Sequence, residues 1–516
     1  MEVGPAFFYY IFSYNLKTIA GINGIGMKNV VVLLMLMALG VPSYGQSPPN
    51  IIWLMAEDIS TDLETYGTAG VETPHLNKLA GEGVKYTNVF STNPICSPNR
   101  SAMMVGAHQN VIGAQHHRSN RNRVLPDPYK PLTYWLRKAG YTNILGHHGV
   151  RGHGRKIDVN FKHERLGPYD GETSFGLFDK LDTLSVADQP FFAQIQLNVT
   201  HRGDWWKQIR RQSPDPVDPD SIELPPYMAD HPVIRQDWAR YLDQVEYMDR
   251  EVGLIMKELE DMGIAGNTVV IFLGDNGRAN VRGKGYLYDP GLRVPLIVRW
   301  PNGLPGGQVS KQVVSTTDIA ASTLQLAGVN LPDYLTGVPF IGTESSREAV
   351  FSARDLWDEV MERSRSVSTR QYKYIRHEMP WVPYDAGQAY LEFYRPALHI
   401  MRSLHRQDRL DSLQASFLSG SKPQEELYDL QNDPHETNNL IDNPACQDEL
   451  SRLRNMLEEW EAGLPESDPD DHNFVSPGAP ELLQWVKYQR TPLYLEMLKG
   501  EEIGFGRLNR KYRSLN

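Results

Sequence analysis

Two apolar segments, each followed at once by acidic and amide side chains, constrain the fold of this chain most strongly. The first is Ile-Ile-Trp-Leu-Met at 51–55, which precedes Glu57, and the second is the β-branched segment 267–273, which precedes Asp275. An apolar run without alternation is typical of a strand that is buried on both faces of a mostly parallel sheet. Ligands of such sheets bind beyond the carboxyl ends of the strands. We therefore expect both polar segments at one functional edge of the sheet.

Helical and extended patterns alternate along the chain as far as about residue 345. Apolar residues recur every three or four positions over 232–262, which predicts the longest helix. Shorter helices are predicted at 73–81, 131–139 and 317–327, and further strands at 141–145, 191–197 and 293–298. The later segments favour antiparallel strands at 366–368, 372–375 and 426–430 and a polar helix at 449–463. This order predicts an α/β fold: a large mixed, mostly parallel sheet flanked by helices, with a smaller C-terminal α+β subdomain.

The composition, 41% hydrophobic and 22% charged residues, fits a globular protein with one large domain and one smaller domain. We predict an N-terminal segment at 1–46, a catalytic domain at 47–345 and a C-terminal subdomain at 346–516. The formal net charge of −11 argues against nucleic acid as a partner.

The N-terminal segment contains one apolar run, 30–40, which follows Lys28 and precedes the small residues Ser43 and Gly45. The run is too short for a membrane span and fits a secretory signal peptide at 27–45, with an upstream extension before it. We therefore expect a bacterial protein that is exported to the periplasm or secreted, with no stable membrane insertion after cleavage. An uncleaved membrane anchor is the alternative.

A Cys-x-Pro-x-Arg motif begins at Cys96. Pro98 suits the first turn of a helix, so Cys96 would lie at a helix N-terminus, where backbone N–H groups favour an anion. The chain has one other cysteine, Cys446, and is therefore not a disulfide scaffold. Two alternatives remain: an ordinary buried thiol at the start of a helix, and a disulfide between the two cysteines.

Together with other segments in the same order, this motif resembles the signature of type I sulfatases. The matching segments are Glu57-Asp58, Cys96 to Arg100, Thr200-His201-Arg202, Gly274-Asp275-Asn276-Gly277, Gly283-Lys284-Gly285 and 426–440. The resemblance covers nearly the whole chain beyond residue 46 and implies an alkaline-phosphatase-like fold. In that family the motif cysteine is converted to formylglycine, so the resemblance also implies a formylglycine-generating or sulfatase-maturating enzyme as a partner.

Formylglycine chemistry accounts for the need for a cysteine precursor. The aldehyde hydrates to a geminal diol, and one hydroxyl attacks sulfur to form a covalent sulfo-enzyme. Loss of a proton from the second hydroxyl then expels sulfate and restores the aldehyde, a step that a serine cannot perform. By this resemblance, the residue derived from Cys96 is the nucleophile and Arg100 holds the diol.

The resemblance also implies a divalent cation near the nucleophile. Its expected ligands are Glu57, Asp58, Cys96, Asp275 and Asn276. The first position is usually aspartate in the family, and a glutamate reaches one methylene further. Ca²⁺ is therefore expected rather than Mg²⁺, because calcium tolerates irregular oxygen geometry better.

Three cationic side chains, Arg100, Lys156 and Lys284, are expected to neutralise the charge of the transition state. Either His201 or Asp158 is expected to protonate the leaving oxygen, and the sequence does not rank them.

The assignment of Lys156 rests on an imperfect match. The family has a Gly-Lys-x-His segment after the strand that corresponds to 141–145, and no such segment follows directly here. The nearest match places Lys156 at the lysine and Asp158 at the histidine, whereas a competing match uses His147 and His148. Lysine is preferred, because a permanent cation at neutral pH binds sulfate better than histidine.

The expected substrate is a sulfated carbohydrate. Export, a basic loop at 147–165 and the pair Trp205-Trp206, which can stack on a sugar, favour this class. The alternatives are that the basic loop is only solvated and that the two tryptophans anchor their own loop. The chain is similar to bacterial polysaccharide sulfatases and to the sulfamidase-like branch, so both O-sulfate and N-sulfate remain open. The alternatives are a phosphoester hydrolase of the same fold and a glycan-binding pseudo-sulfatase in which Cys96 stays unconverted.

Overall fold

The computed structural model describes residues 47–163, 176–344, 347–466 and 479–515. The predicted signal peptide, the predicted boundary at 345 and the end of the basic loop lie outside the described residues. Pro48–Asn516 forms one compact unit. No helix within the described ranges is both long enough and apolar enough to cross a membrane.

An eight-stranded sheet lies at the centre, with the strand order β4-β3-β5-β1-β6-β7-β2-β8. β7 runs antiparallel to its neighbours β6 and β2, and the other neighbouring pairs are parallel. The strands are β1 (Asn50–Ala56), β2 (Val84–Phe90), β3 (Thr142–Leu145), β4 (Lys180–Leu181), β5 (Phe191–Leu197), β6 (Thr268–Gly274), β7 (Leu296–Arg299) and β8 (Gln308–Ser315). The prediction of a mixed, mostly parallel sheet is confirmed.

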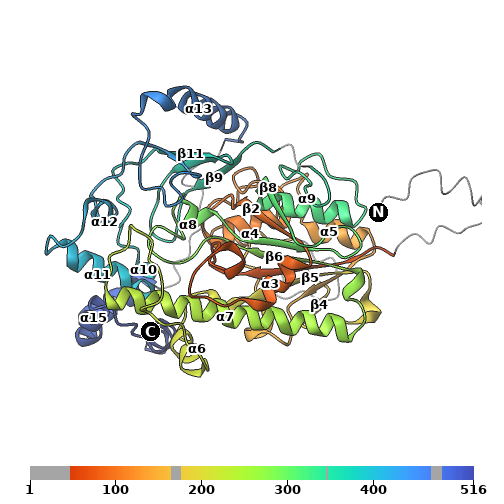
Figure 1. Cartoon of the computed structure of the whole chain (residues 1–516), viewed down its shortest axis with the longest axis horizontal. Helices are drawn as coiled ribbons and strands as arrows, with labels where there is room; N and C mark the ends of the chain where they lie inside the picture. The colour runs from red at the N-terminus through yellow and green to blue at the C-terminus, as the bar shows by residue number, and fades with distance from the viewer. Residues whose placement is uncertain (1–46, 164–175, 345–346, 467–478, 516) are drawn as a thin grey trace, which may run out of the picture. The chain divides into compact units, whose positions relative to one another are not determined.

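Helices cover both faces of this sheet (Figure 1). The helices on one face are α3 (Pro74–Gly81) and α7 (Pro232–Asp261), and those on the other are α4 (Cys96–Val105), α5 (Leu132–Lys138) and α9 (Thr316–Leu326). The sequence of β1 does not alternate because both faces of the strand are buried. Ile52 and Leu54 pack into the core beneath α7, whereas Trp53 packs into the core beneath α4.

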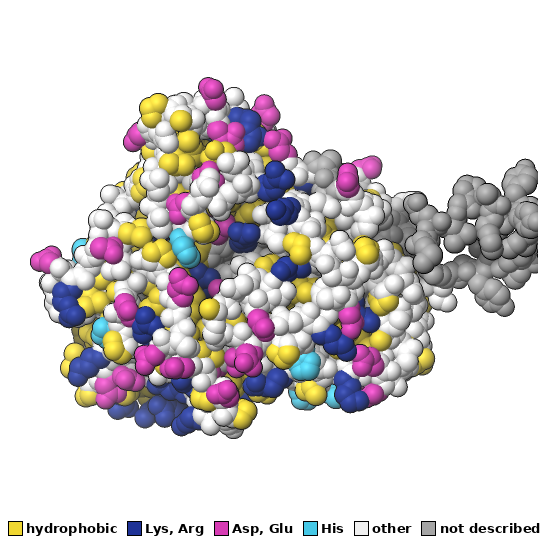
Figure 2. Space-filling view, viewed as in Figure 1, with side chains coloured by type: hydrophobic (Ala, Val, Ile, Leu, Met, Phe, Trp, Pro, Cys, Tyr) yellow, Lys and Arg dark blue, Asp and Glu magenta, His cyan; other side chains and the backbone are white. Residues whose placement is uncertain are grey.

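Acidic and basic side chains intermingle over most of the face shown in Figure 2, and Lys and Arg gather at the lower edge of that view. This mixture agrees with the mild net charge of −11. Over this face an anionic ligand would therefore meet local basic groups rather than one broad basic surface.

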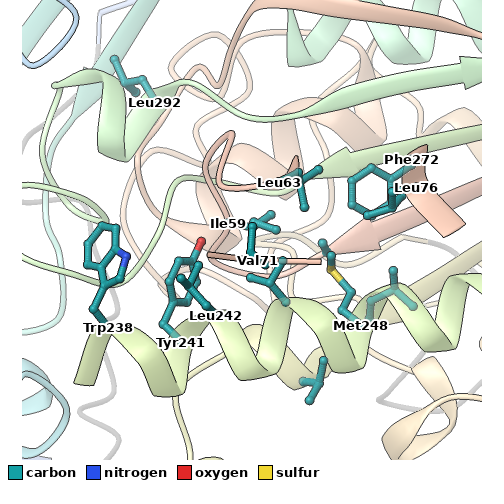
Figure 3. Packing of buried hydrophobic residues seen from close by; sticks show 14 of the residues in the cluster. Ile59, Leu63, Val71, Leu76, Trp238, Tyr241, Leu242, Met248, Phe272 and Leu292 are labelled. Carbon is teal, nitrogen blue, oxygen red and sulfur yellow. The ribbon is translucent and has the colours of Figure 1, made fainter. Parts of the chain in front are cut away.

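The longest helix, α7, holds the segment that follows β1. Figure 3 shows Tyr241, Leu242 and Met248 on the side of α7 that faces Ile59 and Leu63. Full burial of each apolar side chain contributes about 1.5–3 kcal/mol. This packing fixes the chain immediately after the carboxyl end of β1, where the predicted acidic segment lies.

A second, four-stranded antiparallel sheet follows in the order β12-β11-β10-β9. Its strands are β9 (Val350–Arg354), β10 (Ser364–Ser368), β11 (Tyr372–His377) and β12 (Glu425–Asp429). α13 (Gln447–Ala462) covers it and packs Leu453 and Leu457 against Val367 and Tyr374. The predicted change to an antiparallel α+β arrangement is confirmed, while the boundary at 345 stays a prediction.

The remaining helices are mostly short and connect or flank these sheets. The α-helices are α6 (Trp206–Gln212), α8 (Asp289–Leu292), α10 (Ala389–Tyr394), α11 (Pro396–His405), α12 (Ser412–Ser416), α14 (Ala479–Gln489), α15 (Thr491–Leu498) and α16 (Phe505–Arg513). The 3-10 helices are η1 (Glu64–Tyr66), η2 (Arg151–Gly154), η3 (Val186–Asp188), η4 (Asn198–Thr200), η5 (Ala265–Asn267) and η6 (Pro444–Cys446). Of these elements, η2, η4 and α10 lead into or carry side chains of the site described next.

Candidate active site

Parallel pairing of β1 with β6 brings the two predicted ligand segments together. Ala56 pairs with Gly274 at the ends of the two strands, so the acidic segments leave the sheet side by side. The backbone N–H of Asp58 donates to Asp275 Oδ1 at 2.9 Å, and Asn276 Nδ2 donates to Asp58 Oδ1 at 3.0 Å. Asp58 has a φ of 48°, a sparsely populated conformation that concentrates at functional sites.

Three oxygen atoms in this group are buried without a hydrogen-bond partner among the described residues. They are Glu57 Oε1, Asp58 Oδ2 and Asn276 Oδ1. A buried oxygen without a partner costs about 1–3 kcal/mol, and a hard cation satisfies such oxygens. Asp58, Cys96 and Asp275 also offer ligand atoms within 4.8 Å of one another. The predicted ligand set therefore fits a divalent cation.

Cys96 is the first residue of α4, as predicted, and the whole helix is buried. Its Sγ lies 2.8 Å from Lys284 Nζ and 3.7 Å from Asp58 Oδ1. Burial raises the pKa of the Cys96 thiol to about 12, although Lys284 acts in the opposite direction. The unconverted thiol is therefore protonated at neutral pH and a weak nucleophile. Cys96 and Cys446 are both free thiols, so the structure contains no bridge between them.

Arg100 lies one helical turn after Cys96 and points at the acidic segment. Its Nε and Nη2 lie 2.9 and 2.8 Å from Asp275 Oδ2, and its Nη1 donates to Gln196 Oε1 at 2.6 Å. Only 2% of the Arg100 side chain is exposed. A buried charge of this kind is tolerated only with such close partners. Gln196, near the end of β5, is a site residue that the sequence did not single out.

Lys284 is held in place by the glycine that follows it. Lys284 Nζ donates to Asp58 Oδ1 at 2.6 Å. Gly285 has a φ of +93°, and an added Cβ would lie 1.8 Å from the Trp357 ring, so no other residue fits. The Gly285 N–H donates to Pro94 O at 2.9 Å. The Gly-Lys-Gly pattern thus fixes the lysine beside the segment that leads into α4.

Lys156 and Asp158 both reach this group from the loop after β3. Lys156 Nζ donates to Glu57 Oε2 at 2.6 Å and lies 3.6 Å from Asp158 Oδ2. Asp158 accepts from Arg118 at 3.1 and 3.2 Å, and it also accepts from Arg121. Burial opposes ionisation, yet Arg118 and Lys156 hold the pKa of the Asp158 carboxyl well below its usual range. An ionised carboxylate has no proton to donate, which favours a positioning role for Asp158 over that of an acid.

His147 and His148, the competing match, contact α7 instead. Their Nε2 atoms lie 3.1 and 3.3 Å from Glu258 Oε2. Among the described residues, no hydrogen bond or ion pair joins either histidine to Cys96 or to the acidic segments. The geometry therefore supports Lys156 as the lysine beside the acidic group.

His201 lies directly after η4, which follows the end of β5. Its Nε2 lies 3.9 Å from Glu57 Oε2 and 4.0 Å from Asp58 Oδ2, while its Nδ1 lies 3.0 Å from Arg202 O. Because a carbonyl only accepts, Nδ1 carries the ring proton. Burial lowers the pKa of the His201 imidazole to about 3, which Asp58 offsets only in part, so the ring is neutral at neutral pH. The Tyr390 hydroxyl of α10 approaches Nε2 at 3.5 Å, and no sequence pattern pointed to it.

The two adjacent tryptophans support the His201 segment from behind. Trp206 is 1% exposed, and its Nε1 donates to His201 O at 2.9 Å. The Nε1 of Trp205 donates to Val199 O at 3.0 Å, and the Arg151 guanidinium lies 5.2 Å from a Trp205 ring centroid. The expectation that both stack on a sugar is wrong for Trp206, because its ring is enclosed by protein.

Comparison with known proteins decides the family. A family model described as Sulfatase matches residues 49–329, more than half of the chain. The chain belongs to the sulfatase family. A second model, described as N-sulphoglucosamine sulphohydrolase, C-terminal, matches residues 277–388 of this sulfatase. The predicted type I sulfatase family, its alkaline-phosphatase-like fold and its activity as a sulfuric ester hydrolase are confirmed.

Individual relatives agree along most of the chain. This sulfatase is 32% identical over 466 residues to an ulvan-active sulfatase of Formosa agariphila, covering 81% of this chain and 77% of that protein. It is 28% identical over 462 residues to human N-sulphoglucosamine sulphohydrolase, covering 80% and 90%. A solved structure in complex with D-glucosamine-2-N,6-O-disulfate has a TM-score of 0.55 and 17% identity, covering 82% of this chain and 99% of that one. This last likeness bears on the fold alone.

Proposed function

We propose that this sulfatase removes sulfate from a sulfated carbohydrate, with formylglycine derived from Cys96 as the nucleophile. The observation that carries this proposal is the position of Cys96 Sγ, which lies between Lys284 Nζ at 2.8 Å and Asp58 Oδ1 at 3.7 Å, next to buried oxygens that lack partners. The relatives named for ulvan and for N-sulphoglucosamine support a carbohydrate substrate.

The proposed cation is Ca²⁺, held by Glu57, Asp58, Asp275 and Asn276 beside residue 96. These side chains supply oxygen atoms only, which suits a hard cation, and the longer glutamate suits the irregular geometry of calcium better than the octahedron of magnesium. When bound, the ion would polarise sulfate oxygens and lower the pKa of a neighbouring hydroxyl. It would also satisfy the three buried oxygens that lack partners.

Conversion of Cys96 requires a formylglycine-generating or sulfatase-maturating enzyme as a partner. In the structure Sγ stands in for the hydroxyl oxygens that the hydrated aldehyde would present. The raised pKa of the thiol supports the need for conversion, because a protonated thiol attacks poorly. Formylglycine supplies two hydroxyl groups, one to attack sulfur and one to release the product.

Around that position, Arg100, Lys156 and Lys284 would surround the sulfate with positive charge. Each now neutralises a carboxylate of the site, namely Asp275, Glu57 and Asp58 respectively. A bound cation would take over these carboxylates and leave the three cationic groups to stabilise the oxygens of the transition state.

For the leaving oxygen, we propose that His201 is the proton donor and that Asp158 is a positioning residue. His201 Nε2 is accessible to a proton because Nδ1 already donates to a carbonyl. The negative charge of a bound sulfate ester near the ring would favour its protonated form. Asp158, by contrast, is ionised and held by two arginines.

We further propose export through a signal peptide at 27–45, on the strength of the apolar run and its flanking residues. The protein would then act in the periplasm or outside the cell, where sulfated polysaccharides are found. A C-terminal subdomain beginning near residue 346 is proposed from the change of sheet between β8 and β9.

The test is sulfate release by protein that has been co-expressed with a formylglycine-generating enzyme and supplied with Ca²⁺. Ulvan oligosaccharides and glucosamine N-sulfate are compared as substrates, with an aryl phosphate alongside, and free sulfate and phosphate are measured by ion chromatography. We expect sulfate release by the parent protein and by Cys446→Ser, and no turnover by Cys96→Ser. Release of phosphate faster than sulfate, or equal release of sulfate by the parent protein and by Cys96→Ser, would contradict the proposal.

A further inference from the structure

Two adjacent histidines after β3 meet a glutamate of α7 in a cluster separate from the active site. His147 Nε2 lies 3.1 Å from Glu258 Oε2, and His148 Nε2 lies 3.3 Å from the same oxygen. All three side chains offer a ligand atom within 4.8 Å of the others. Two imidazoles and one carboxylate are a set of ligands that zinc uses with a water molecule as the fourth.

The buried histidine of this cluster has a nitrogen without a hydrogen bond. The His147 side chain is 1% exposed, and its Nε2 makes no hydrogen bond to any described residue, although Glu258 Oε2 is only 3.1 Å away. Buried polar atoms nearly always have a partner, and one that lacks it requires an explanation such as an ion. The nitrogen lies beside the Glu258 carboxylate, where a metal ion would satisfy both groups.

The distances agree with a tetrahedral zinc ion. With zinc bonds of about 2.0–2.1 Å, tetrahedral geometry places neighbouring ligand atoms about 3.3 Å apart. The two observed nitrogen-to-oxygen distances are 3.1 and 3.3 Å. We propose that His147, His148 and Glu258 form a zinc-binding site that is distinct from the calcium site.

Coordination requires a proton to move within the His147 ring. Nδ1 now accepts from the Gly149 N–H at 2.9 Å, so a neutral ring carries its proton on Nε2. Zinc at Nε2 moves that proton to Nδ1, and the Gly149 peptide turns away from it. This change exchanges the hydrogen bond between Gly149 and Nδ1 for the bond from Nε2 to zinc. The His148 ring stacks on the His147 ring with centroids 4.6 Å apart, and since 60% of its side chain is exposed it would turn its ring edge toward the ion when zinc binds.

Zinc would fasten the loop that leads to Lys156 onto α7. The same loop already contacts α7 at a second point, where the Arg151 N–H donates to Glu251 Oε1 at 2.5 Å. Glu251 and Glu258 are seven residues apart, which places them on one face of the helix two turns apart. A metal ion at Glu258 would add a second fixed point to this loop.

The test is zinc binding, in excess Ca²⁺, by untagged protein whose residue 96 has been converted to formylglycine, so that no thiol of the active site binds zinc. Zinc is titrated against a chromogenic chelator, and the parent protein is compared with His148→Ala and Glu258→Gln. Both changes lie at partly exposed positions and leave the buried His147 in place. The matched control is His153→Ala, because His153 lies in the same loop and pairs with Asp182 at 2.6 Å without a third ligand.

We expect one zinc ion per parent chain. His148→Ala and Glu258→Gln should each weaken binding by at least about tenfold, since the loss of even an outer partner costs a metal site that much. His153→Ala should bind as the parent does. No zinc bound by the parent, or equal weakening in His153→Ala, would overturn the proposal.

Discussion

Replacing Lys156 with alanine tests whether Lys156 is one of the cationic side chains that stabilise the transition state. Two unit charges about 4 Å apart at a partly screened protein site attract each other by about 4 kcal/mol. Water reaches Lys156, whose side chain is 24% exposed, and weakens this attraction. Taking about 3 kcal/mol of lost transition-state stabilisation, we expect kcat/KM for sulfate release to fall about 100-fold.

The assay compares initial rates of sulfate release for Lys156→Ala, Lys156→Arg and His148→Ala, together with bound calcium. Lys156→Ala should keep its calcium, because Glu57 loses a competing cation when Lys156 is removed. Lys156→Arg should recover part of the rate, since the charge is kept. His148→Ala should lose clearly less activity than Lys156→Ala, because no hydrogen bond or ion pair joins His148 to the site among the described residues.

The reasoning would be refuted if Lys156→Ala kept a rate close to that of the parent, or if His148→Ala lost as much activity. Either result would favour the competing match. Loss of calcium from Lys156→Ala would instead mean that the residue acts on the cation site rather than on sulfate.

Three further predictions concern the cation, the core and the pH. Asp275→Asn should lose bound calcium, measured by mass spectrometry of the metal, and sulfatase activity together; full activity would sink the assignment. Arg202→Ala should lower the unfolding free energy by about 3–5 kcal/mol in urea, because Arg202 and Asp237 form a buried pair with bonds of 2.5 and 2.6 Å; an unchanged midpoint would contradict this. Burial lowers the pKa of His108 to about 3 in the folded protein. The free energy of unfolding therefore keeps its full value above the pKa of the unfolded histidine, about 6.5, and falls as the pH drops below it. At about pH 5 the loss is about 2 kcal/mol. His108→Gln should flatten this pH dependence in denaturation curves, whereas the exposed His405→Gln should not.

The sequence predicted those parts of the site that depend on local pattern. β1 and β6 are continuous apolar runs, so their positions and the acidic segments beyond them followed from periodicity and from the rule on strand ends. The start of α4 at Cys96 followed from Pro98. These features are fixed by neighbours in the chain, which a sequence displays directly.

Other parts depend on contacts between distant segments. Tyr390 reaches His201 across nearly two hundred residues of chain, and the role of Asp158 depends on Arg118 from a different loop. Among the strands, β2, β4, β8 and β9 were missed. In β2 polar side chains interrupt the apolar pattern, as its half-buried Lys85 and Thr87 show. Trp206 shows a different limit, because the sequence alone did not decide between stacking on a sugar and anchoring a loop, and the structure places it in the core.

The central claim, a formylglycine nucleophile at position 96, is tested most directly by a mass spectrum of the tryptic peptide that spans residues 86–100. The protein should come from its native host or from co-expression with a formylglycine-generating enzyme. The account predicts an aldehyde at residue 96 that reacts with a hydrazine probe and is absent from Cys96→Ser. An unmodified thiol in protein that turns over sulfate esters would contradict it.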